Sequence, residues 1–177
     1  LTTLRNAGLD PEVVVSGVDE DGVEETEAAQ VALKLAQLKA VAVAATQPRS
    51  LVIGCDSVLE FEGRILGKPA DADDAVRRWK MMRGRSGVLH TGHCVIDNHR
   101  EVWIARSAAT KVRFAQISDD EIAAYVATGE PMGKAGAYGV QGKAAAYIEH
   151  ISGSYSGIMG LPMYETAQLL RAIGFSV

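Results

Sequence analysis

The stretch LVIGCDS at residues 51–57 is the segment from which the fold is best inferred, because an apolar run there ends in a carboxylate. Short apolar runs rich in β-branched residues are typical of a buried strand. An unpaired charge beside an apolar core is costly, so Asp56 is expected to have a partner. The tripeptide GKP at residues 67–69 follows in a tight turn and supplies Lys68. Asp56 and Lys68 are therefore the first candidate site residues.

Length and composition predict a single globular domain over residues 1–177. The chain is 47% hydrophobic and 23% charged, which is ordinary for a globular protein with a sizeable core. Its formal net charge is −4 and no basic stripe stands out, which argues against a groove for long nucleic acid. An anion of nucleotide size needs only a few well-placed cations and remains compatible with this balance.

The sequence also bears on the cellular compartment. It contains no apolar run of the roughly 18 residues needed to span a membrane, and nothing in it resembles a signal peptide. Cys55 and Cys94 lie inside apolar runs and lack the spacing of zinc ligands or of a disulfide scaffold. We expect both thiols to be buried in a reducing compartment, and hence a cytoplasmic protein without a membrane partner.

Periodicity predicts an α/β fold with a mixed, mostly antiparallel twisted sheet flanked by helices. Residues 118–121 (SDDE) form a capping box that starts one of the helices. The expected strands span residues 12–18, 51–61, 64–66, 88–96, 102–114 and 144–151, and the expected helices span residues 25–46, 71–82, 118–128 and 164–173.

A glycine-rich segment at residues 132–143, MGKAGAYGVQGK, is a candidate ligand loop. Small residues allow backbone N–H groups to approach a ligand closely. Gln141 carries both a donor and an acceptor, which suits the reading of a nucleobase edge, and Tyr138 has a ring that can stack. Lys134 lies near the start of the loop. A flexible surface loop is the alternative interpretation.

Alternatives stay open for the charged candidates. Asp56 fits a general base, a metal ligand or an ion-paired turn carboxylate, and Lys68 fits a phosphate ligand or a surface turn. The acidic group at residues 19–21 fits metal binding or a solvated turn. Lys39 flanks the apolar stripe of the helix at 25–46, but periodicity does not separate it from Lys34.

Taken in order, the motifs resemble the Maf family of nucleoside triphosphate pyrophosphatases, historically linked to septum formation. The resemblance covers most of the chain. The matching stretches are VSGVDED (15–21), LKLAQLKA (33–40), VIGCDSV (52–58), ILGKPADADDA (65–75), HTG (90–92), FAQISDDEIAAYVATGEP (114–131), KAGAYGVQG (134–142) and GSYSGIMGLPMYET (153–166).

The resemblance implies a Maf/ITPase-like fold and an enzyme that hydrolyses a nucleoside triphosphate between its α- and β-phosphates. It implies that Asp56 is the catalytic residue. The substrate-binding residues that we expect are Lys39, Ser57, Lys68, Lys134 and Gln141, and Ser57 stands at a position tied to base selection.

The same resemblance implies a divalent cation, Mg²⁺ or Mn²⁺, bound by Asp56 and Glu20, and suggests a homodimer. Within the enzyme class, clearance of non-standard nucleotides and a preference for pyrimidines both stay open. Outside it, the alternative is a non-catalytic, nucleotide-binding regulator of cell division that uses the same pocket.

The N-terminal segment departs from the family pattern. Family members open with a strand and a phosphate-binding loop of the type S-x-S-P-R-R. This sequence begins with LTTLRNAGLD, which resembles the helix that follows that loop, and Arg5 is not a convincing substitute for the arginines of the loop.

Overall fold

A five-stranded antiparallel sheet forms the centre of the protein. The computed structural model describes residues 1–20 and 22–176. The strands are β1 (Leu51–Phe61), β2 (Arg64–Leu66), β3 (Ser86–Asp97), β4 (Val102–Phe114) and β5 (Ile148–Gly153), in the spatial order β2-β1-β3-β4-β5. All four pairings among them are antiparallel. The predicted α/β class with a mostly antiparallel sheet is confirmed, and β1, β2 and β4 have their predicted bounds.

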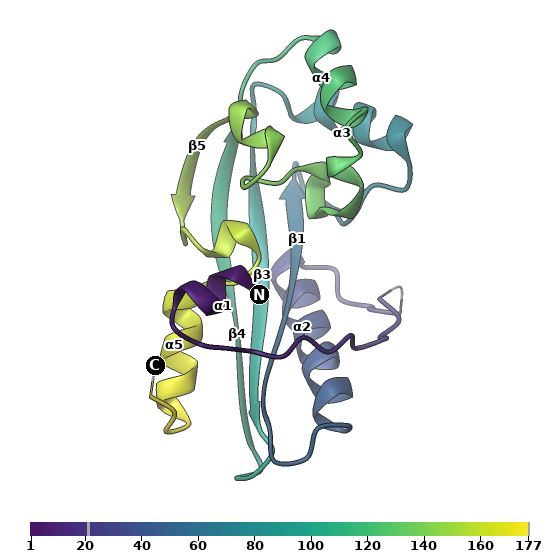
Figure 1. The fold of residues 1–177 in the computed structure, drawn as a ribbon. Coiled ribbons are helices and arrows are strands. Elements are labelled where there is room, and N and C mark those ends of the chain that lie inside the picture. Colours follow the sequence, from purple (N-terminus) through teal and green to yellow (C-terminus); the bar gives the residue numbers. More distant parts are fainter. Residues whose placement is uncertain (21, 177) are drawn as a thin grey trace.

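Helices cover both faces of this sheet (Figure 1). Helix α2 contacts β1 and β3 on one face, and α5 contacts β3 and β4 on the other, where Val95 packs against Leu169 and Leu170. The α-helices are α1 (Thr2–Asn6), α2 (Ala28–Ala44), α3 (Ala72–Met82), α4 (Asp119–Val126) and α5 (Met163–Ala172), and the 3₁₀ turns are η1 (Glu130–Gly133), η2 (Ala135–Ala137), η3 (Lys143–Tyr147) and η4 (Gly157–Met159). None of the helices in the described part of the chain is long and apolar enough to cross a membrane.

Helix α2 lies unusually close to the sheet. Its buried side is a row of alanines, and the strands below it carry glycine at the points of contact. A Cβ atom on Gly54 would lie 2.5 Å from the Ala36 carbonyl oxygen, and one on Gly92 would lie 2.1 Å from that of Ala32. Small residues on both sides thus bring the α2 backbone, and with it Lys39, down onto β1.

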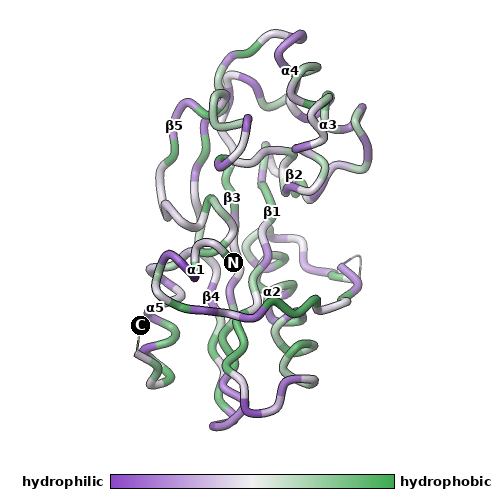
Figure 2. Tube along the Cα trace, viewed as in Figure 1, coloured by the Kyte–Doolittle hydropathy of each residue, from purple (hydrophilic) through white to green (hydrophobic). Residues whose placement is uncertain are grey.

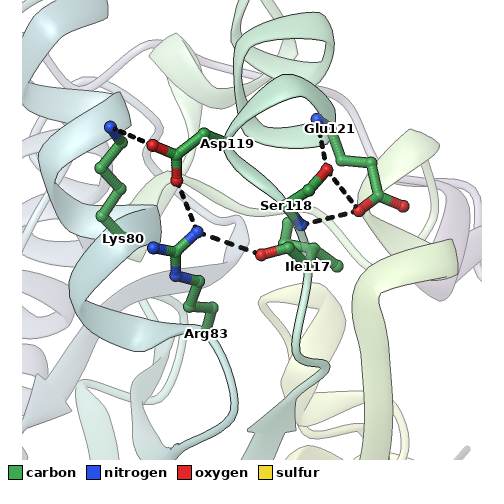
Figure 3. A network of polar contacts seen from close by, with 6 residues as sticks. All are labelled: Lys80, Arg83, Ile117, Ser118, Asp119 and Glu121. Carbon is green, nitrogen blue, oxygen red and sulfur yellow. Dashed lines mark hydrogen bonds and ion pairs between the residues drawn. The ribbon is translucent and has the colours of Figure 1, made fainter.

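Helices α3 and α4 pack together at one end of the molecule (Figure 1), where polar side chains connect them (Figure 3). The carboxylate of Asp119 accepts hydrogen bonds from Lys80 at 2.8 Å and from Arg83 at 2.6 Å. The predicted capping box is present, because Ser118 and Glu121 each bond the backbone N–H of the other. Beneath these contacts, the buried ring of Trp79 meets its aromatic neighbours edge-on.

Two predicted strands are corrected by the structure. Residues 12–18 form no strand. The segment runs past α2 as an extended apolar chain (Figure 2), and Val15 is 89% exposed. Its β-branched residues favour extended backbone, but a strand also needs a hydrogen-bonding neighbour, and no described residue pairs with it. The strand predicted at 144–151 begins only at Ile148, because residues 143–147 form the 3₁₀ turn η3.

Candidate active site

Strand β1 delivers two consecutive polar side chains to opposite faces of the sheet. Asp56 lies opposite Gly92 of β3 and faces α2, whereas Ser57 lies opposite Thr91 and faces the other side. Along residues 51–58 the described pairings of β1 are with β3 alone, since β2 pairs with it only at residues 59–61. The two side chains therefore flank a free edge of the sheet.

On the α2 face, two carboxylates and two lysines form a cluster. The ammonium group of Lys39 bonds the Asp56 carboxylate and lies 2.7 Å from Glu20 Oε1. Lys68 lies farther out, with its Nζ atom 3.7 Å from Glu20 Oε2. The side chains of Asp56 and Lys39 are 15% and 19% exposed, against 59% for Lys68. The cluster thus has an inner ion pair and a solvated outer lysine.

Burial and charge act against each other within this cluster. Burial raises the pKa of Asp56 above its ordinary value, and the hydrogen bond from Lys39 offsets only part of that effect. Burial also opposes the charged form of Lys39, yet its hydrogen bonds to both carboxylates leave its pKa raised. The pKa of Glu20 is lowered by the hydrogen bond from Lys39. Asp56 is the better proton acceptor of the two carboxylates.

The opposite face of β1 borders a cavity of about 310 Å³. Ser57 and Leu89 form part of its wall, and Lys134 and Gln141 line it from the glycine-rich loop. A second, larger cavity of about 600 Å³ follows the free edge of β1 and reaches Lys39. Met159 and Gly160 line both cavities, so the two meet at the end of η4. A ligand placed across this edge would touch both faces of the strand.

The GKP turn at residues 67–69 and the glycine-rich loop are hydrogen-bonded to each other and to α3. The Gly136 N–H donates to the carbonyl of Gly67 at 3.0 Å, next to Lys68. The same carbonyl accepts a bond of 2.7 Å from the Arg78 guanidinium, and Trp79 donates to the Ala137 carbonyl at 2.8 Å. Arg78 and Trp79 therefore set the spacing between Lys68 and the cavity. The sequence marked them only as helix residues.

Glu130 is a third residue whose role sequence reasoning missed. Its carboxylate accepts hydrogen bonds from the Tyr125 hydroxyl at 3.1 Å and from the N–H groups of Lys143 at 2.8 Å and Ala144 at 3.3 Å. Burial works to raise the pKa of Glu130, but these bonds outweigh it and the pKa is lowered. Glu130 thereby fixes the residues directly after Gln141. An acid between a helix end and a proline carries no sequence signal for this role.

We expect Glu130→Ala to weaken nucleotide binding while sparing the chemical step. Without the carboxylate, the loop bearing Gln141 loses the two hydrogen bonds that Lys143 and Ala144 donate to Glu130, whereas the Lys39–Asp56 pair is untouched. KM for the best nucleoside triphosphate should rise about tenfold with kcat within about threefold, as measured by steady-state pyrophosphate release.

Glu121→Ala is the matched control for this variant. Glu121 also bonds backbone through its carboxylate, at Ser118 of the α4 capping box. Its loss should lower the melting temperature and leave KM unchanged. Equal KM values for Glu130→Ala and Glu121→Ala would contradict the assignment of Glu130.

The structure brings together most of the predicted site residues. Asp56, Lys39, Glu20 and Lys68 meet at one cluster, while Ser57, Lys134 and Gln141 line the adjoining cavity. Asp21 of the acidic group lies outside the described residues.

Two other side chains do not join the site as ligands. The ring of Tyr138 is 5% exposed and packs edge-on against Phe114, so it is not free to stack on a ligand. Arg5 lies 3.6 Å from Asp10, where it forms an ion pair.

The cluster also has the donors for a divalent cation. Mg²⁺ commonly binds one or two carboxylates together with substrate phosphates, and Glu20 and Asp56 offer such oxygens on either side of one ammonium group. Among residues 1–20 and 22–176, no group of three or more metal-binding side chains converges. The donor set fits a cation that substrate phosphates help to hold.

An α/β fold with an acid–lysine cluster and a neighbouring cavity defines a class of protein with a charged ligand site at the edge of its sheet. A sequence model described as Maf-like protein matches residues 1–173, and the chain belongs to that family. It is 49% identical over 180 residues to a Streptomyces avermitilis protein, covering 100% of this chain and 87% of the relative. A Salinispora tropica protein is also 49% identical, with coverage of 99% and 80%. Both relatives are named nucleoside triphosphate pyrophosphatase.

Proposed function

We propose that this protein is a nucleoside triphosphate pyrophosphatase, a hydrolase that converts a (deoxy)nucleoside triphosphate to the monophosphate and pyrophosphate. The observation that carries the proposal is the convergence of Asp56, Lys39, Glu20 and Lys68 beside the cavity that Ser57 and Gln141 line. Family membership over residues 1–173 and the names of the relatives support it.

The geometry suggests how the substrate lies. The base occupies the cavity lined by Ser57 and Gln141, and the triphosphate crosses the free edge of β1 toward Lys39 and Lys68. Two lysines oppose the roughly four negative charges of the triphosphate, and Lys39 is held in place by the carboxylates around it. Only an edge without a paired strand permits this path between the two faces.

Asp56 acts as the general base in this proposal. It accepts a proton from water as the water oxygen bonds to the α-phosphorus and the bond to the α,β-bridging oxygen breaks. Pyrophosphate leaves with the electron pair of that bond, and its added charge lies near the lysines. A divalent cation, Mg²⁺ or Mn²⁺, held by Asp56 and Glu20 would supply further charge neutralisation at the phosphate oxygens.

A pyrophosphate-release assay tests the proposal. Each standard nucleoside triphosphate, together with methylated analogues, is incubated with and without Mg²⁺ or Mn²⁺, and nucleotide binding is measured in parallel. We expect pyrophosphate and monophosphate in equal amounts from at least one substrate. Binding without product from any nucleotide would favour the non-catalytic regulator. Cytoplasmic location, a role in septum formation and a homodimer remain further proposals.

A further inference from the structure

A buried hydroxyl lies directly behind Ser57. Thr91 is 1% exposed, and its Oγ1 atom is 2.8 Å from Ser57 Oγ and 3.3 Å from the carbonyl oxygen of Gly157. Ser57 lines the cavity, and Thr91 connects it to the turn η4 on the far side. The Gly157 carbonyl is itself held by the N–H of Gly160 at 2.9 Å. The Ser57 hydroxyl, the Thr91 hydroxyl and the Gly157 carbonyl thus form a chain of polar contacts, here called the relay, and its Gly157 end is fixed.

Counting protons gives this relay a direction. A hydroxyl has one proton to donate, and a carbonyl oxygen only accepts. If Thr91 donates to Gly157, it can accept only from Ser57, and both contacts become hydrogen bonds. If Thr91 instead donates to Ser57, its second contact places two oxygens together without a proton. The first arrangement makes one more hydrogen bond, avoids the contact between two oxygens, and is favoured.

In that arrangement the Ser57 hydroxyl donates its only hydrogen bond to Thr91. What Ser57 presents to the cavity is a lone pair, so it accepts a hydrogen bond from the ligand and cannot donate one. Gln141 differs in this respect, because a terminal amide offers either a donor or an acceptor according to how it is turned. Of the two polar side chains expected at the base, only Ser57 has a fixed polarity.

We propose that Thr91 is a positioning residue that fixes Ser57 as a hydrogen-bond acceptor, so that the cavity selects nucleobases presenting an N–H donor to it. This inference rests on the proposed function, which places the base in this cavity. The chemical class is defined at the single base atom that faces Ser57: an amino or ring N–H group at that atom is accepted, and a carbonyl oxygen or bare ring nitrogen at that atom is rejected.

The test uses substrate pairs of nearly equal shape and reversed polarity. CTP and UTP exchange an amino group for a carbonyl and a ring nitrogen for a ring N–H, and ATP and ITP do the same. The member that presents N–H to Ser57 should be favoured about tenfold or more in kcat/KM and in Kd, because the other brings two acceptors together.

Thr91→Val removes the relay while keeping the shape of the side chain. The Ser57 hydroxyl then turns freely and donates to the disfavoured member, so the preference within the pair should shrink severalfold. Thr91→Ser retains the hydroxyl and should keep the wild-type preference. Ser57→Ala should abolish it, which provides a second test if Thr91→Val does not fold.

Thr110→Val is the matched control. Thr110 is also buried, at 2% exposure, and its hydroxyl donates to the Ser154 carbonyl at the same distance of 3.3 Å. Among the described residues, this hydroxyl is not hydrogen-bonded to Ser57. It should lose stability and keep the base preference of the wild type.

Three results would overturn the inference. Equal use of both members of each pair by the wild type would refute it while leaving the pyrophosphatase function intact. A uniform fall in kcat/KM in Thr91→Val, with unchanged ratios, would reduce Thr91 to a structural residue. Absence of both binding and pyrophosphate release for every nucleotide would overturn the proposed function itself, and the inference with it.

Discussion

Asp56→Asn is expected to release pyrophosphate about 10³-fold more slowly than the wild type while binding nucleoside triphosphate at least as tightly when no divalent cation is present. The amide has the size of the carboxylate and still offers an oxygen to Lys39, so the cluster keeps its shape. It cannot take a proton from water. It also removes one negative charge near the path proposed for the triphosphate, which favours binding of the anion.

The measurement is a comparison of kcat from pyrophosphate release with Kd from calorimetry. Asp73→Asn, which makes the same change at an exposed acid in the first turn of α3, controls for the general effect of charge. Turnover by Asp56→Asn at a rate near that of Asp73→Asn would exclude Asp56 as the base.

The pH profile of the wild-type enzyme should also show that Asp56 acts as the general base. Burial raises the pKa of Asp56, so its protonated, inactive form persists to higher pH than for an ordinary aspartate. The acid limb of kcat/KM is therefore expected above the ordinary aspartate pKa of 3.8. In Asp56→Asn, the residual rate should lose this limb.

The sheet was largely predictable because its signals are local. The apolar run at 51–61 specified β1 to the residue, and small or polar residues at its ends set its limits. The segment at 12–18 shows the limit of such reasoning, since three consecutive valines favour extended backbone but cannot supply a partner strand. At 144–147 a carboxylate distant in sequence, Glu130, captures the backbone N–H groups and turns the chain.

The site was less predictable because its geometry depends on contacts between distant elements. The residues proposed to bind substrate were identified through ordered motifs. The residues that hold them, Glu130, Arg78 and Thr91, act through backbone carbonyls and N–H groups brought close by the fold. No spacing in a single sequence encodes such contacts. Nor does spacing show that Asp56 and Ser57, adjacent in the chain, serve opposite faces of the sheet.

Helix α2 shows most clearly how the site depends on contacts between distant elements, and the last prediction concerns this helix. Helical periodicity does not single out Lys39 from Lys34, yet Lys39 reaches the carboxylates while Lys34 is exposed. The close approach of α2 over Gly54 and Gly92 is what brings Lys39 within reach of β1. Lys39→Met and Lys34→Met are therefore a matched pair on one helix.

We expect Lys39→Met to lower kcat/KM about 10²- to 10³-fold and Lys34→Met to leave it unchanged. Lys39 lowers the pKa of Asp56 through both its hydrogen bond and its charge, against the effect of burial. Removing it raises that pKa further, so Asp56 is deprotonated only at higher pH and the acid limb of the pH profile moves in the alkaline direction. A loss of activity without this movement would limit Lys39 to phosphate binding. An unchanged kcat/KM would contradict its place in the site.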